Sequence, residues 1–196
     1  RLVTEGDPVD ASGRVPCREV PVVSHQTPLH SIHQDAGASF TDFSGWTMPV
    51  RYSSDLAEHH AVRQAAGLFD LSHMAEIRVS GPDAAAGLDY ALGGSMSALE
   101  VGDAKYTLIL NEQAGIIDDL VVYAIGPTEF LIVANAGNRD AVVQALAERT
   151  KEFSIELSDE TESTVMLAVQ GPHAERIVQS LAELDCATPL AKLGYY

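Results

Sequence analysis

The sequence predicts an α+β fold of mostly antiparallel sheets with helices packed on one face. Two apolar runs, 106–110 and 116–125, flank a turn, which predicts an antiparallel hairpin. A strand, a Gly-Pro pair and a helix also occur twice, beginning at Ile77 and at Leu167. Gly-Pro is a common helix opener, so coincidence is one explanation. We prefer a duplicated strand–helix–strand unit, which predicts helices along one face of a sheet.

Composition excludes several classes of protein. The chain has 196 residues, enough for one large domain, and 46% of them are hydrophobic, enough for a sizeable core. Its net charge of −16 argues against nucleic acid and against an anionic membrane surface as partners. Cys17 and Cys186 fit neither a metal site nor a disulfide framework. We see no membrane-spanning run and no signal or transit peptide, so we expect a cytoplasmic protein.

The N-terminal segment 1–26 is predicted to be an extended or mobile tail, because glycines and prolines interrupt it and no hydrophobic period develops. A short strand at 18–23 is the one element we consider there. The folded domain is then expected to cover 27–196.

The first helix is predicted to start with Thr27 as N-cap and Pro28 in the first turn, and to end at Gly37. A strand at 40–43 follows, and then a compact aromatic loop at 44–50. We expect Trp46 in this loop to be a core residue rather than a ligand platform.

A second helix is predicted from Asp55 to Ala66, with Asp55 and Glu58 as a capping box and Gly67 as the residue after its end. It carries the adjacent pair His59 and His60. Neighbouring residues on a helix point in different directions, so this pair cannot chelate one metal ion, and we predict no metal site.

The remaining elements follow from the same signals. We expect strands at 75–80 and 129–134, and a helix after Asn135–Asn138 that runs to Glu152. Phe153, Ile155 and Leu157 then alternate like a strand, before an acidic, solvated turn at 158–162. The residues expected to face the core from the helices after the two Gly-Pro pairs are Leu88, Leu92, Ile177, Val178, Leu181 and Leu184.

Two carboxylates, Asp118 and Asp119, lie inside the apolar strand 116–125. Side chains alternate along a strand, so the two must point to opposite faces, with Asp119 and Tyr123 on the same face. One interpretation is that both aspartates belong to the turn and remain in water. The other is that Asp119 is desolvated, lines a pocket and meets a ligand.

Several stretches, taken together, resemble the aminomethyltransferase of the glycine cleavage system, the T-protein. The resemblance covers 27–196 in the right order. Its motifs are Thr27-Pro28-Leu29, Asp42-Phe43-x-Gly45-Trp46-x-Met48-Pro49, Glu58-His59-His60-Ala61-Val62-Arg63, Gly67-x-Phe69-Asp70-x-Ser72-His73-Met74, Gly115-Ile116-Ile117-Asp118-Asp119-Leu120-Val121-Val122-Tyr123 and Ala168-Val169-Gln170-Gly171-Pro172. Ala114 stands where the family usually has glycine. Family chains also continue into a Gly-Tyr-Thr-Gly-Glu stretch and a further domain, so the resemblance implies a domain incomplete at its C-terminal end.

The resemblance implies a function. T-proteins take an aminomethyl group carried on the lipoyl arm of the H-protein, pass its carbon to tetrahydrofolate as 5,10-methylene-tetrahydrofolate, and release ammonia; no metal is used. The family's key aspartate falls on Asp119. Its pterin-lining positions fall on Met74, Tyr106, Tyr123, Asn135, Tyr195 and Tyr196. We further expect that this chain alone is inactive.

The residue types suit that chemistry. A carboxylate can orient nitrogen donors and stabilise an iminium cation, and aromatic or methionine side chains suit a flat pterin. Ordinary core packing is the alternative for each wall residue. Two other functions stay open: the folate domain of a demethylating oxidase, whose flavin fingerprint this chain lacks, and a non-catalytic folate-binding protein of iron–sulfur maintenance.

Overall fold

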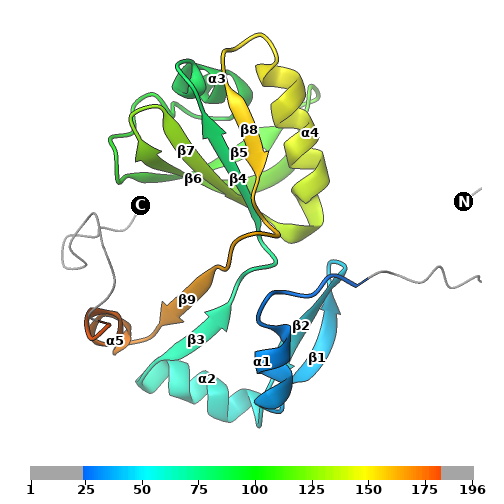
Figure 1. Cartoon of the computed structure of the whole chain (residues 1–196), viewed down its shortest axis with the longest axis vertical. Coiled ribbons are helices and arrows are strands. Elements are labelled where there is room, and N and C mark those ends of the chain that lie inside the picture. Colours follow the sequence, from blue (N-terminus) through cyan, green and yellow to red (C-terminus); the bar gives the residue numbers. More distant parts are fainter. Residues whose placement is uncertain (1–23, 182–196) are drawn as a thin grey trace, which may run out of the picture.

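The structure is a computed structural model that describes residues 24–181, and it has the predicted α+β fold with antiparallel sheets (Figure 1). The helices are α1 (His30–Asp35), α2 (Asp55–Gln64), α3 (Ala84–Ala91), the 3-10 turn η1 (Ala136–Asn138), α4 (Arg139–Thr150) and α5 (Ala174–Gln179). The strands are β1 (Ser39–Phe43), β2 (Trp46–Arg51), β3 (Gly67–Asp70), β4 (Ala75–Ser80), β5 (Ala104–Leu110), β6 (Ile116–Gly126), β7 (Glu129–Ala134), β8 (Glu156–Asp159) and β9 (Leu167–Gln170).

Three sheets organise these strands. A five-stranded sheet has the order β5-β6-β7-β4-β8, and two-stranded sheets pair β1 with β2 and β3 with β9. The predicted hairpin of β5 and β6 and the third strand β7 are confirmed, and they form a meander whose strands share long registers. Strand β4, which precedes the meander in the chain, pairs with the free side of β7, and β8, which follows the meander, pairs with β4. Residues from before and after the meander thus complete one sheet.

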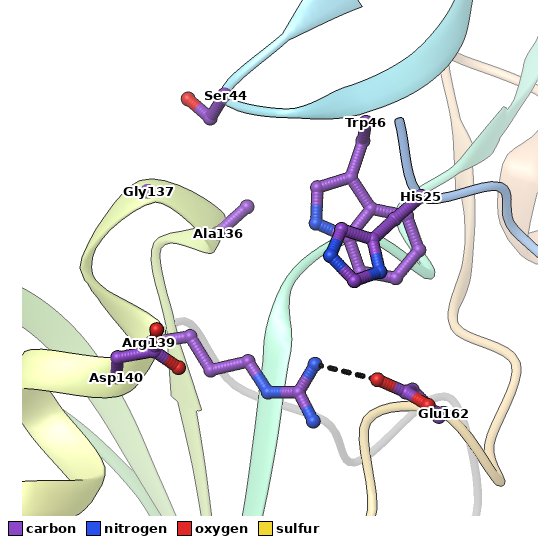
Figure 2. Close-up of a pocket in the computed structure, with 8 residues that line it drawn as sticks. All are labelled: His25, Ser44, Trp46, Ala136, Gly137, Arg139, Asp140 and Glu162. Atoms are coloured by element: carbon purple, nitrogen blue, oxygen red, sulfur yellow. Dashed lines mark hydrogen bonds and ion pairs between the residues drawn. The ribbon is translucent and has the colours of Figure 1, made fainter. Parts of the chain in front are cut away.

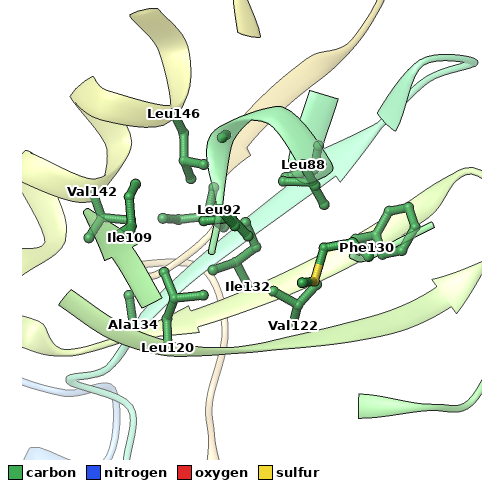
Figure 3. Close-up of a cluster of buried hydrophobic side chains, with 14 of the residues drawn as sticks. Leu88, Leu92, Ile109, Leu120, Val122, Phe130, Ile132, Ala134, Val142 and Leu146 are labelled. Atoms are coloured by element: carbon green, nitrogen blue, oxygen red, sulfur yellow. The ribbon is translucent and has the colours of Figure 1, made fainter. Parts of the chain in front are cut away.

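The main core lies between the five-stranded sheet and the helices α3 and α4, which cover one of its faces (Figure 3). Leu88 of α3 is fully buried, as predicted, and Leu146 of α4 is fully buried as well. Each such side chain contributes about 2 kcal/mol when it leaves water. Their partners on the sheet include Ile77, Ile109, Leu120, Val122, Phe130 and Ile132. The opposite face of the sheet carries Tyr106, Asp119 and Tyr123, all of them exposed.

The two Gly-Pro pairs open helices after sheet strands, as predicted. Gly81 follows β4 with φ +132°, and Gly171 follows β9 with φ +122°. The amide of Ala84 donates to the Gly81 carbonyl at 3.1 Å, and that of Ala174 donates to the Gly171 carbonyl at 3.0 Å. The two units nevertheless lie in different sheets.

The prediction that α5 turns an apolar stripe to the core is wrong within the described residues. Ile177 is 40% exposed and Leu181 is 54% exposed, whereas Leu184 lies outside the described residues. A helical period shows that a face is apolar, but it does not supply the neighbour that would cover that face.

Both predicted helix starts near the N-terminus are displaced. The first helix begins at His30 rather than Pro28, and the Thr27 hydroxyl donates instead to Asp70 Oδ2 at 2.6 Å. Ser54, not Asp55, is the N-cap of α2, and its hydroxyl accepts from the Ala57 amide. Glu58 Oε1 accepts from the amides of Tyr52 and Ser53, which satisfies donors just before the helix.

Two predicted loops contain strands. Residues 46–50, expected in an aromatic loop, belong to β2, which pairs with β1. Pro49 is tolerated there, since β2 pairs with a single strand. Strand β8 starts at Glu156 and reaches Asp159, so it extends into the predicted acidic turn. That turn is not fully solvated, since Thr161 is 1% exposed.

The end of the predicted tail contacts the fold. The amide of His25 donates to the Gly45 carbonyl at 2.8 Å, and the His25 carbonyl accepts from the Thr47 amide at 2.8 Å. The predicted strand at 18–23, Cys17 and Cys186 lie outside the described residues.

Candidate functional site

Asp118 and Asp119 point to opposite faces of β6, as the strand alternation predicts. Asp118 is 2% exposed and accepts from the Asn135 amide (2.9 Å), Asn135 Nδ2 (2.9 Å) and Asn138 Nδ2 (2.6 Å). Asp119 is exposed. Each of the two interpretations is therefore wrong in one part: Asp118 does not remain in water, because the helices cover the face on which it lies, and Asp119 is not desolvated.

Two side chains hold the Asp119 carboxylate in place. The Tyr106 hydroxyl donates to its Oδ2, and Asn135 Nδ2 donates to its Oδ1 at 3.1 Å. The same amide nitrogen donates to the Asp119 carbonyl at 3.1 Å and to Asp118 Oδ1 at 2.9 Å. Asn135 thus couples the buried aspartate to the exposed one, at the point where β7 ends.

The other predicted wall residues lie close by. Tyr123 follows Asp119 by four residues on the same face of β6 and is 37% exposed, and Tyr106 on β5 is 53% exposed. Met74 directly precedes Ala75, which pairs with Ala134, so the backbone of Met74 lies beside that of Asn135. Tyr195 and Tyr196 lie outside the described residues.

We define the open face as the side of the five-stranded sheet that faces away from α3 and α4. It brings together Tyr106, Asp119 and Tyr123, with Asn135 and Met74 at its end. Such a surface offers an oriented carboxylate next to aromatic rings, and this combination suits a flat ligand with nitrogen donors.

Comparison with known proteins places the chain in a family. The family model described as the GCVT N-terminal domain matches residues 29–196. The chain belongs to this family.

Similar proteins named aminomethyltransferase occur in several bacteria. The one from Corynebacterium jeikeium is 56% identical over 87% of this chain and 47% of its own length. The one from Cutibacterium acnes is 55% identical over 78% of this chain and 41% of its own length. The chain therefore spans less than half the length of these curated relatives.

A solved structure has the same fold. The crystal structure of glycine cleavage system aminomethyltransferase T from Bartonella henselae superposes with a TM-score of 0.77 at 40% identity, covering 80% of this chain and 43% of that chain. The fold of the GCVT N-terminal domain described above thus agrees with that of an aminomethyltransferase T.

This GCVT N-terminal domain also contains a polar cavity of about 410 Å³ beside the start of α4 (Figure 2). Trp46, 5% exposed, lies against the ring of His25 with centroids 5.1 Å apart, and both line the cavity. Across from them, Arg139 Nε donates to Asp159 at 2.7 Å and Nη1 donates to Glu162 at 3.3 Å. Its charge is therefore already neutralised. Trp46 is a buried residue, as predicted, that also forms a cavity wall.

Sequence reasoning missed a hydrogen-bond network around Asp70. Asp70 Oδ2 accepts from Thr27 and contacts His33 Nε2 at 2.9 Å, while His33 Nδ1 lies 2.7 Å from the Tyr52 hydroxyl. Burial alone would raise the pKa of Asp70, but hydrogen bonds from Ser72, Thr27 and His33 hold it below its usual value. These contacts join α1 to β3, so the network is structural. The spacing of its members along the chain gave no signal of it.

Two further features of residues 24–181 bear on function. No group of three or more His, Cys, Asp or Glu side chains in this part could hold a metal ion. None of its helices has the length and apolar character needed to cross a bilayer.

Proposed function

We propose that this chain is the folate-binding part of a glycine cleavage aminomethyltransferase. Its substrates would be an aminomethyl group on the lipoyl arm of an H-protein, and tetrahydrofolate as the acceptor. The products would be 5,10-methylene-tetrahydrofolate and ammonia. The proposal also places the protein in the cytoplasm. Family membership and relatives named aminomethyltransferase support it.

The observation that carries the proposal is the fixed carboxylate of Asp119 on the open face. Tyr106 and Asn135 donate to its two oxygens, which orients it without neutralising its charge. Attack on the aminomethyl carbon needs a neutral folate nitrogen, and the reaction develops an iminium cation. An oriented carboxylate accepts a hydrogen bond from the N–H of that nitrogen and stabilises the positive charge as it develops.

The walls of the proposed site suit a pterin. Tyr106 pairs with Val121, and Tyr123 follows Val121 by two residues on the same face, so a flat ring can lie against both exposed tyrosines. Met74, next to Asn135, adds a polarisable contact. Tyr195 and Tyr196, the other residues proposed for the wall, lie outside the described residues.

The test uses a hybrid enzyme in which this chain replaces the matching part of the Corynebacterium jeikeium aminomethyltransferase. Ammonia release from aminomethylated H-protein is measured with tetrahydrofolate present. We expect Asp119→Asn to lower turnover by about a thousandfold or more, which corresponds to at least about 4 kcal/mol in the barrier. Asparagine keeps the shape and loses the charge.

Glu112→Gln is the matched control, since it removes an exposed carboxylate from the turn that precedes β6. It should leave turnover unchanged. If Asp119→Asn retains turnover within about threefold of the wild type, a barrier change below ~1 kcal/mol, Asp119 is not the key carboxylate.

A further inference from the structure

Asp118 is a buried charge on a face of β6 that is otherwise apolar. It is 2% exposed, and the next two side chains on its face, Leu120 and Val122, are 1% and 0% exposed. A carboxylate in such a place costs desolvation free energy, and a well-packed apolar side chain would serve the core at least as well. The position of Asp118 therefore indicates a role other than core packing.

Two asparagines give their side chains to Asp118 instead of capping a helix. Asn135 is the N-cap of η1 and Asn138 is the N-cap of α4, but neither side chain makes a capping hydrogen bond within the described residues. An asparagine in this position normally accepts from a helix amide and stabilises the helix start. Here Asn138 Nδ2 donates to Asp118 Oδ1 at 2.6 Å, and Asn135 Nδ2 donates to the same oxygen at 2.9 Å.

The side-chain amide of Asn135 has both of its hydrogens committed to the two aspartates. Its nitrogen lies 2.9 Å from Asp118 Oδ1 and 3.1 Å from both the carbonyl oxygen and Oδ1 of Asp119. One hydrogen thus points to Asp118, and the other is shared by the two acceptors of Asp119. In the flipped orientation the oxygen of this amide would face all three acceptors, so the surroundings select the orientation that presents N–H to Asp119.

Asp118 is the fixed member of this arrangement. Its other oxygen, Oδ2, accepts from the main-chain amide of Asn135 at 2.9 Å, and the Asn138 amide donates to the Asn135 carbonyl at 3.0 Å. Asp119, by contrast, is exposed, so its carboxylate can turn toward water. The buried carboxylate therefore sets the direction of the Asn135 amide, and that amide in turn restrains the exposed carboxylate.

We propose that Asp118 is a positioning residue for the reaction: it holds the Asn135 amide with its nitrogen toward Asp119, so that the reacting carboxylate keeps a fixed direction. This inference rests on the proposed function and assigns a further residue to that site. Asp118 itself touches no substrate. Its effect is on the rate, because a carboxylate that loses one of its side-chain donors spends less time in the productive direction.

Asp118→Asn disturbs this arrangement in either orientation of the new amide. Asp118 accepts three hydrogen bonds and donates none, whereas an asparagine side chain has one oxygen and one NH₂ group. If the new NH₂ group faces Asn135 Nδ2, the Asn135 amide turns over and brings its oxygen against Asp119. If it faces the main-chain amide of Asn135 instead, that amide loses its acceptor.

The experiment uses the hybrid enzyme described above and measures kcat and KM for tetrahydrofolate in Asp118→Asn, Asp119→Asn and the double variant. Asp118→Asn should lower kcat by about thirtyfold and leave KM within about twofold, because the carboxylate is misdirected while the binding surface is unchanged. In the double variant, kcat should equal that of Asp119→Asn alone, since Asp118 acts only through Asp119. Independent contributions to the rate would multiply instead.

Val142→Ala is the structural control. Val142 of α4 is fully buried in the core, and its truncation destabilises the protein without removing a polar group. Rates are compared at a temperature at which unfolding curves show every variant to be folded. Val142→Ala should then keep kcat within about twofold of the wild type, and Asp118→Asn would do the same if Asp118 had a merely structural role.

A second measurement needs no variant. In the ¹⁵N-labelled 196-residue chain, the side-chain NH₂ group of Asn135 should exchange its hydrogens with water at least about tenfold more slowly than that of Asn111. Asn111 is exposed in the turn before β6, whereas both hydrogens of Asn135 are held by the aspartates.

The inference is overturned if Asn135 exchanges as fast as Asn111, or if the double variant is slower than Asp119→Asn by the full factor that Asp118→Asn shows alone. It is also overturned if Asp118→Asn keeps kcat within about threefold of the wild type or lowers it as far as Asp119→Asn does. When Asp119→Asn lowers turnover by about a thousandfold, each of these results removes Asp118 and leaves the proposed function standing. If Asp119→Asn retains turnover, the proposed role of Asp119 and this inference fail together.

Discussion

Asp118 and Asp119 show how much one position along a strand changes the role of a carboxylate. Asp118 lies under the helices and is encircled by three N–H donors from Asn135 and Asn138. Asp119 lies in water and receives a hydroxyl and an amide. The buried aspartate holds the residues at the end of β7, and the exposed one is the proposed catalytic carboxylate.

At this scale we predict that Asp118→Asn destabilises the protein by about 2–3 kcal/mol, because the new amide group faces donors and loses charge-assisted hydrogen bonds. Urea unfolding of the chain measures this loss. Asp119→Asn is the comparison, and it should change stability by less than about 0.5 kcal/mol, as expected for an exposed residue. Equal losses of stability in the two variants would contradict the prediction, because the buried Asp118 would then matter no more for stability than the exposed Asp119.

At the scale of elements, two strand–Gly-Pro–helix units repeat the same local geometry. Each glycine has a positive φ and lies against main chain: a Cβ on Gly81 would be 2.5 Å from the Ser154 carbonyl oxygen, and one on Gly171 would be 2.5 Å from the Val62 carbonyl oxygen. The glycine thus lets a helix start close to a neighbouring segment. The two units therefore share this close packing against main chain as well as the order of their residues.

We therefore predict that Gly81→Ala destabilises the protein by about 3–5 kcal/mol, from backbone strain plus the clash with the carbonyl. Gly171→Ala should act alike. Gly37→Ala is the control, because Gly37 has φ +78° but a Cβ there would meet no atom within 4 Å, so strain alone costs about 1 kcal/mol. Denaturant midpoints of the variants measure these losses of stability. A loss in Gly81→Ala no larger than that in Gly37→Ala would contradict the prediction.

At the scale of the whole molecule, the chain presents surfaces that a single folded unit would normally cover. The open face leaves Tyr106 53% exposed, so a ligand there would be covered from one side only. Around β3, β9 and α5, the exposed apolar residues include Leu68 (67%), Leu167 (49%) and Leu181 (54%). Exposed apolar side chains of this kind favour association.

We predict that the 196-residue chain alone binds tetrahydrofolate weakly and releases no ammonia from aminomethylated H-protein. Tight ligand binding depends on burying most of the ligand surface, which one open face does not do. Its net charge of −16 also gives an anionic folate tail no long-range attraction. Calorimetry and an ammonia-release assay test this, with the hybrid enzyme as the positive control. Turnover by the chain equal to that of the hybrid would show that the site is complete within these residues.

The same surfaces should make the chain self-associate as its concentration rises, which sedimentation velocity would detect. Leu68→Lys should reduce the association, because it places a charge in the exposed apolar area. Glu112→Lys makes a similar change in charge at an exposed turn and serves as the control.

The sequence by itself determined the features that depend on local periodicity and turn chemistry. The meander of β5, β6 and β7, the helices after both Gly-Pro pairs and the opposite directions of Asp118 and Asp119 all follow from alternation and from residues near in the chain. The tertiary structure alone decided which face of β6 the helices cover, and hence which aspartate is buried. It also decided that Thr27 binds Asp70 rather than capping a helix, and that the stripe of α5 stays exposed. Those outcomes depend on segments far apart in the sequence, and a local pattern does not record which of them meet.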